Sequence, residues 1–117
     1  MEIRKLEDYA IARVTSNSVL IKDTVSILDF VMSVQHETSY NKIIVDKCII
    51  SEDFFDLKTK LLGEAFQKLI IYDIKLGIIG DFSAYESQSL KDYIYECNQG
   101  RHICFATVEQ EAIDRLK

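Results

Sequence analysis

Two aspartates stand where acid–base or metal chemistry could take place. Asp46 comes directly after the apolar run Ile43-Ile44-Val45, and Asp81 follows a second apolar run. Paired carboxylates at neighbouring strand ends can bind a metal ion or transfer protons. The commoner role is structural, in which each carboxylate caps a turn or helix amide or pairs with Lys47 or Lys58. We favour the structural role.

A lysine and a hydroxyl side by side form a second candidate site. The sequence places Lys58 and Thr59 in the first turn of a predicted helix, and a helix N-terminus can hold an anion. No glycine-rich loop precedes them, and Glu52, Asp53 and Asp56 lie just before. These acids already suit the helix dipole and would repel phosphate. A phosphate site is therefore not favoured.

Serine nucleophiles are a third possibility, at Ser83, Ser87 and Ser89. None lies in the G-x-S-x-G pattern of a nucleophile elbow. The only histidines are His36, after a predicted helix, and His102, at the start of a predicted strand. Neither is expected near the serines, so helix capping is the simpler role.

Metal binding and disulfides are equally poorly supported. His102 and Cys104 point to one side of a strand, but two ligands do not make a zinc site. The other cysteines, Cys48 and Cys97, leave an odd number without paired spacing. Reduced thiols in a cytoplasmic protein are the simplest interpretation. We predict no metal and no cofactor.

Four aromatic residues lie in predicted loops: Phe54, Phe55, Phe82 and Tyr85. Buried, they would extend the core; exposed together, they would form a patch for a partner. We predict that Phe55 and Phe82 are in the core, and that Phe54 and Tyr85 are on the surface.

The elements that must position these residues follow from hydrophobic periodicity. The pattern predicts an α/β fold with a five-stranded mixed sheet in the order β-β-α-β-α-β-α-β-α. Its first two strands form a hairpin around the two-residue turn Glu7-Asp8. Strands are predicted at 2–6, 9–14, 43–45, 74–79 and 103–106, and helices at 24–36, from about 57 to 70, from 89 to 100 and after 107.

Capping residues set the predicted helix starts. Asp23 is the expected N-cap of the first helix. Ser89 with Asp92, and Thr107 with Gln110, have the spacing of capping boxes for the last two helices.

The predicted sheet also locates a site. Ligands and partners of a parallel sheet meet the loops after the carboxyl ends of its strands. The loops 46–56 and 80–87 are longer than the two to six residues usual there, which indicates function. The predicted binding edge is therefore the segment 51–59 with the segment 81–89.

Length and charge exclude several classes. The 117 residues contain no proline and no linker, so we predict one domain over residues 1–117. The net charge is −5, with no basic stripe that could track a nucleic-acid backbone or anionic lipid. No apolar run approaches the ~20 residues of a membrane helix. We predict neither nucleic acid nor membrane as a partner.

Two stretches resemble a known family. One is Asp53-Phe54-Phe55-Asp56-Leu57-Lys58-Thr59, continuing through Gly63-Glu64 and Gln67-Lys68. The other is Gly80-Asp81-Phe82-Ser83, followed by Ser87, Ser89-Leu90, Asp92, Ile94-Tyr95-Glu96 and Asn98. Over essentially the whole chain they resemble the bacterial domain-of-unknown-function family 4180. The resemblance implies a bacterial origin and supplies no activity.

The element order resembles the STAS fold of anti-sigma-factor antagonists. That resemblance implies a regulatory domain whose partner docks around the start of the second helix. The family's switch serine lies in an Asp-Ser-Ser/Thr-Gly motif. Here Asp56 matches the aspartate, but Leu57 and Lys58 replace the hydroxyl residues, and Thr59 is a shifted substitute. This departure argues against the usual phosphorylation switch.

Our first hypothesis is a STAS-like regulatory or protein-interaction domain without catalysis, with an unknown protein partner. The alternative is a small-ligand site or undescribed enzyme that uses Asp46, Lys58, Asp81 and Ser83 at the same edge. Homodimerisation stays open, because a small sheet with a free edge often pairs.

Overall fold

A five-stranded mixed sheet forms the centre of the chain. The computed structural model describes all residues from 1 to 117. The strand order is β1-β2-β3-β4-β5; β1 is antiparallel to β2, and β2 to β5 are parallel. The predicted α/β class and mixed sheet are confirmed. The strands are β1 (Glu2–Leu6), β2 (Ile11–Thr15), β3 (Lys42–Asp46), β4 (Lys75–Ile79) and β5 (Ile103–Ala106).

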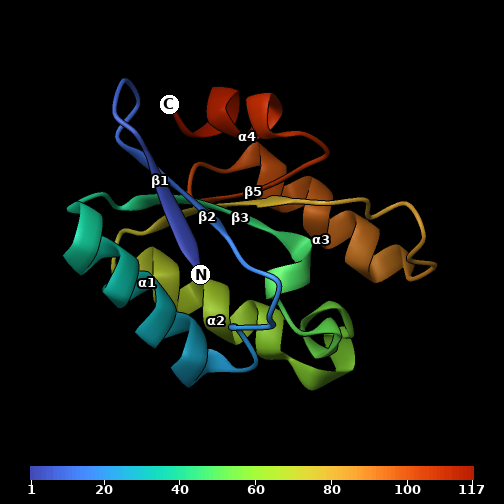
Figure 1. Cartoon of the computed structure of the whole chain (residues 1–117). Coiled ribbons are helices and arrows are strands. Elements are labelled where there is room, and N and C mark those ends of the chain that lie inside the picture. Colours follow the sequence, from blue (N-terminus) through green and yellow to red (C-terminus); the bar gives the residue numbers. More distant parts are fainter.

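Four helices cover the sheet unequally. In Figure 1, α1 and α2 lie on one side of the sheet and α4 on the other. The inward side chains of α3 join the same core as α1 and α2. No helix has both the length and the apolar character needed to cross a membrane. The helices are α1 (Thr24–Thr38), α2 (Leu61–Ile71), α3 (Gln88–Gln99) and α4 (Glu109–Leu116).

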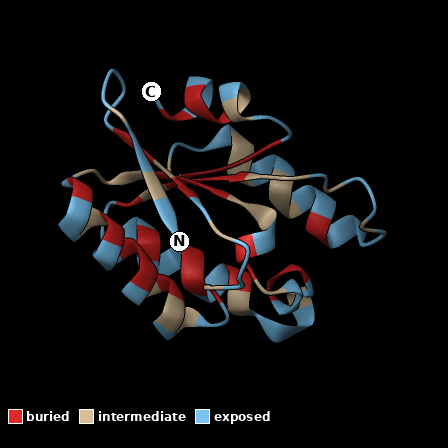
Figure 2. Cartoon of the chain, in the orientation of Figure 1, coloured by how far each residue is buried: buried red, intermediate tan, exposed pale blue.

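The alternation of strand residues divides the interior into two cores. Ile43 and Val45 of β3 join a cluster of 23 buried residues under α1, α2 and α3. Ile44, between them, points to the other face and joins a cluster of 7 buried residues under α4. Figure 2 shows the buried positions along the strands and the inner sides of the helices. The β-branched run of β3 is therefore buried on both faces, as its sequence predicts.

The first hairpin differs from its predicted turn. Leu6 pairs with Ile11, so four residues rather than two connect the strands. The backbone amide of Tyr9 donates to the Leu6 carbonyl, and Ala10 has a φ of 55°. The longer turn keeps Leu6 and Ile11 against the small core, which fixes the register.

The first helix begins where its sequence predicts and ends two residues later, at Thr38 instead of 36. The Asp23 side chain accepts from the Ser26 amide at 2.7 Å, and the Ser26 hydroxyl accepts from the Asp23 amide at 3.0 Å. Each residue thus satisfies an amide that the first turn leaves free.

The predicted cap of the third helix is wrong. Ser87, not Ser89, caps α3, and its hydroxyl accepts from the Leu90 amide at 3.2 Å. Asp92 accepts instead from the Gln88 side chain at 2.9 Å. Ser87 and Ser89 are both serines near the boundary, so local spacing does not separate them.

The predicted cap of the last helix is also wrong. Val108 is the N-cap of α4, and its side chain is exposed. The Thr107 amide donates to the Glu111 carboxylate at 3.0 Å, while Gln110 donates to Asp114. An acidic side chain reaching back from the first turn replaces the hydroxyl cap.

Candidate functional site

Three short 3₁₀ turns connect β3 to α2, at Lys47–Ile49, Glu52–Phe55 and Leu57–Thr59. The second helix begins only at Leu61, so the prediction that Lys58 and Thr59 lie in its first turn is wrong. The cause is local capping: the Asp56 carboxylate accepts from the Lys58 amide at 3.1 Å. Such side-chain bonds compete with the start of an α-helix.

Thr59 holds this segment closed. Its hydroxyl lies 2.8 Å from the carbonyl oxygens of both Asp53 and Asp56, to which it can donate. It also lies 3.3 Å from the Leu61 amide, from which it accepts. Thr59 thus stabilises the backbone conformation of this segment, and it does not line the groove described below.

An ionic cluster connects this segment with the loop before α3. Lys47 Nζ lies 2.5 Å from Glu52 Oε1, and the Tyr85 hydroxyl donates to Glu52 Oε2 at 2.7 Å. Lys47 and Glu52 both lie in the segment that follows β3, whereas Tyr85 lies more than thirty residues after Glu52 in the sequence. Glu52 is therefore the bridge between the two predicted loops.

Aromatic rings pack beneath this cluster. The Phe55 centroid lies 5.8 Å from Phe82 and 5.6 Å from Tyr85. Lys47 Nζ lies 5.2 Å from the Phe55 centroid and 5.0 Å from that of Tyr85, within cation–π range. The centroid of the Phe82 ring lies 5.1 Å from that of Phe105 in β5, and the two rings pack edge to face. Rings thus connect the surface cluster to the core.

The charges in this cluster are held in their ordinary states. Hydrogen bonds from Lys47 and Tyr85 lower the pKa of Glu52. Burial acts to lower the pKa of Lys47, but Glu52 and Tyr85 outweigh it and the pKa is raised. Burial raises the pKa of Tyr85. All three shifts move away from neutrality, so none of these groups is tuned for proton transfer near pH 7.

Gly80 makes room for Lys47. A Cβ atom at Gly80 would lie 2.7 Å from the Lys47 Cβ, closer than real atoms approach. The backbone at the end of β4 therefore passes directly against the side chain that the cluster depends on. Glycine is required here for close approach.

The structure corrects the prediction for Phe54 and confirms the prediction for Phe55. Phe54 is fully buried in the large core, so its predicted place on the surface is wrong. The Ser51 hydroxyl accepts from the Asp53 amide and closes the turn that carries Phe54 inward against α2. Phe55 is buried as predicted. Phe82 and Tyr85 are half-buried and pack on the same core.

The two strand-end carboxylates point to different partners. Asp46 Oδ1 lies 2.9 Å from Arg13 Nη2, rather than near Lys47 or Lys58. Asp81 Oδ1 accepts from the Ser83 amide at 2.9 Å and from its hydroxyl at 2.6 Å. These bonds lower the pKa of Asp81. Asp81 caps a turn as predicted, and no group of three or more acidic, histidine or cysteine side chains could hold a metal.

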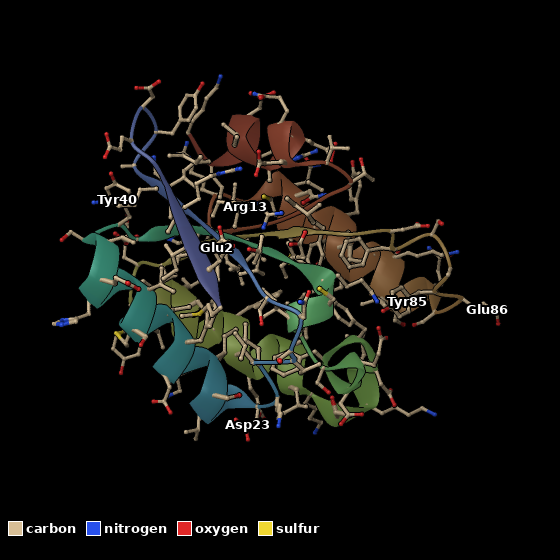
Figure 3. All side chains as sticks on the ribbon, in the orientation of Figure 1. Glu2, Arg13, Asp23, Tyr40, Tyr85 and Glu86 are labelled. Atoms are coloured by element: carbon tan, nitrogen blue, oxygen red, sulfur yellow. The ribbon has the colours of Figure 1, made fainter.

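A groove of about 580 Å³ lies between the two predicted loops. Four predicted residues line it, namely Asp56, Lys58, Tyr85 and Ser87. Asp46, Phe54, Thr59, Asp81 and Ser83 do not. Figure 3 shows Tyr85 and Glu86 on the loop that leads into α3, away from Arg13 on β2. The full lining is Glu52, Phe55, Asp56, Leu57, Lys58, Tyr85, Glu86, Ser87 and Ser89.

Lys47, Glu52 and Glu86 belong to this site but were not predicted as site residues. Lys47 and Glu52 are five positions apart, a spacing that brings side chains together neither on a helix nor on one face of a strand, and they lie in separate 3₁₀ turns. Their shared partner Tyr85 is distant in sequence, so no local signal joins the three.

Comparison with known proteins supplies a family but no activity. No curated protein and no solved structure matches the chain. A family model described as a domain of unknown function (DUF4180) matches residues 6–116. The match covers both loops that form the groove and all four helices. The chain therefore belongs to the DUF4180 family.

Proposed function

We propose that this chain is a bacterial, cytoplasmic regulatory domain with a STAS-like fold, which binds a protein partner in the groove between residues 52–58 and 85–89. The single observation that carries the proposal is the groove itself. It opens at the carboxyl edge of the parallel strands, where partners of such sheets bind. Both loops predicted to form an interface contribute to it.

The lining suits a basic and partly apolar partner segment. Glu52 and Lys47 are paired with each other, which leaves two further carboxylates in the lining, Asp56 and Glu86, and one cation without an ion pair, Lys58. Phe55 and Leu57 supply apolar surface below these charges. An acidic groove of this kind speeds association with a positively charged segment and disfavours acidic ones.

Binding accounts for the groups in the groove better than catalysis does. The pKa values of Lys47, Glu52 and Tyr85 are all shifted away from neutrality. The Ser83 hydroxyl is held by Asp81, and no histidine lies in the groove. The four groups of the alternative enzyme hypothesis do not meet, since Asp46 is paired with Arg13.

A charge reversal in the groove tests the proposal. Glu86→Lys changes an exposed lining residue that forms no hydrogen bond or ion pair with its side chain. Glu37→Lys, on an exposed site near the end of α1, makes the same change at the opposite edge of the sheet. Proteins captured from a lysate of the source cells by the unchanged chain would be purified, and their affinities for both variants measured.

We expect Glu86→Lys to weaken the specific partner about tenfold or more and Glu37→Lys to leave its affinity unchanged. Equal affinity of both variants for every captured protein would show that the groove is not the interface.

A further inference from the structure

A second cavity lies at the opposite edge of the sheet and shares no residue with the groove. It has a volume of about 280 Å³ and sits between the second halves of α2 and α3 and the start of β5. It is lined by Phe66, Ile70, Tyr93, Glu96, Cys97, Gly100, Arg101, His102 and Ile103.

The inner wall of this cavity is apolar. Phe66 and Ile103 are almost fully buried, and the Phe66 and Tyr93 ring centroids lie 6.2 Å apart. Ile70 remains 43% exposed although it lies beside them. Burial raises the pKa of Cys97 to about 11 and that of Tyr93 to about 12, so both stay neutral at physiological pH. The wall thus offers an uncharged surface to an apolar group.

Two exposed charged side chains of opposite sign line the same cavity without partners. Arg101 forms no ion pair or hydrogen bond with its side chain, whereas Arg4, Arg13 and Arg115 all do. Glu96 likewise has no ion pair or side-chain hydrogen bond, and it does not reach within salt-bridge distance of Arg101.

The histidine in the lining is already engaged. His102 Nε2 lies 3.3 Å from the Asp73 carboxylate. Arg101 and Glu96 are therefore the groups free to recognise a charged ligand.

We propose that this cavity binds a free amino acid with a large apolar side chain. The side chain lies against Phe66, Ile70 and Tyr93, the ligand carboxylate pairs with Arg101, and the ligand ammonium pairs with Glu96. A ligand with only an acidic group would meet the uncompensated charge of Glu96, and one with only an amine that of Arg101. A zwitterion satisfies both, and the volume suits a molecule smaller than a typical drug.

Ligands that differ by one charge test the assignment. We would titrate L-phenylalanine, 3-phenylpropanoate and 2-phenylethylamine into the intact chain, and follow binding by amide chemical-shift changes in NMR spectra. Phenylalanine is expected to bind saturably at millimolar concentrations or below, with shifts at residues 66–70 and 93–103. Each single-charge analogue should bind about tenfold more weakly or worse.

Variants provide the second half of the test. Arg101→Gln and Glu96→Gln should each weaken phenylalanine about tenfold and abolish its advantage over the analogue that lacks the matching charge. Lys58→Gln and Glu86→Gln make the same charge changes in the groove at the other edge, and should leave phenylalanine affinity unchanged. Amide spectra without ligand would show that each variant is folded.

Three results would overturn the proposal. They are no saturable binding of phenylalanine by the unchanged chain, equal affinity for either single-charge analogue, and unchanged affinity in both cavity variants. Since the two sites share no residue, none of these results bears on binding of a protein partner in the groove.

Discussion

The two faces of the sheet are built on different principles. Under α1, α2 and α3 the face is covered by a continuous apolar core of 23 buried residues. Under α4 the core has 7 buried residues, and it covers β3 to β5 together with only the turn end of the hairpin, at Leu6 and Ile11. Beside it, ion pairs join β1, β2, β3 and α4.

Arg13 is the centre of that ionic half. Its side chain is only 11% exposed, and it bonds Glu109 at 2.8 Å, Asp46 at 2.9 Å and the Val14 carbonyl at 3.0 Å. One arginine thus connects the start of α4 to the end of β3, where apolar contacts run out. Apolar burial therefore stabilises one face of the sheet, while the other face depends on a polar network beside a small core.

Matched truncations in the two cores give the largest expected effect. Leu62→Ala in α2 and Leu116→Ala in α4 remove the same atoms from positions that are both nearly fully buried. We expect Leu62→Ala to lower the free energy of unfolding by about 4 kcal/mol, and Leu116→Ala by about 2 kcal/mol, because the small core at the end of the chain can relax around the cavity. Urea denaturation at neutral pH measures both. Equal losses would show that the two faces contribute alike.

Replacing Arg13 tests the ionic network. Arg13→Met keeps the aliphatic stem but leaves the Asp46 and Glu109 carboxylates without their shared cation, so we expect a loss of about 2–3 kcal/mol in unfolding free energy. Arg4→Met is the matched control: its side chain is 60% exposed and pairs only with Glu109, so its loss should stay under about 1 kcal/mol. A loss from Arg13→Met no larger than that of the control would show that the network is incidental.

Alkaline pH tests the small core through one thiol. Burial raises the pKa of Cys104 from 9.0 to about 11. Between these values the unfolded thiol ionises while the folded one stays protonated, so the folded state binds more protons and stability falls as pH rises. The loss of unfolding free energy that is due to Cys104 should reach about 2 kcal/mol near its folded-state pKa. Urea denaturation from neutral to alkaline pH should show a shallower fall in Cys104→Ala than in the unchanged chain. Parallel curves would contradict a buried thiol.

Much of the fold could be predicted because its signals are local. The run Ile43-Ile44-Val45 indicates a strand buried on both faces, and the structure buries it in two cores. Asp23 caps α1 through the amide three residues on, which spacing alone predicts. The two long loops predicted at the carboxyl edge both line the groove.

The errors occur where two local solutions compete or where a partner is distant in sequence. Ser87 and Ser89 are equivalent as caps until the loop from β4 is packed. Phe54 and Phe55 are adjacent aromatics, and only the placement of their 3₁₀ turn against α2 buries both.

The sequence by itself determined the α/β class, the element order and the edge at which a site could form, because hydrophobic period and capping act within a few residues. Only the tertiary structure decided which groups meet. Asp46 pairs with Arg13, Glu52 joins Lys47 to Tyr85, and Glu96 and Arg101 remain without partners. The contacts of Asp46 with Arg13 and of Glu52 with Tyr85 join residues 33 positions apart, and no local sequence pattern encodes contacts at such a separation.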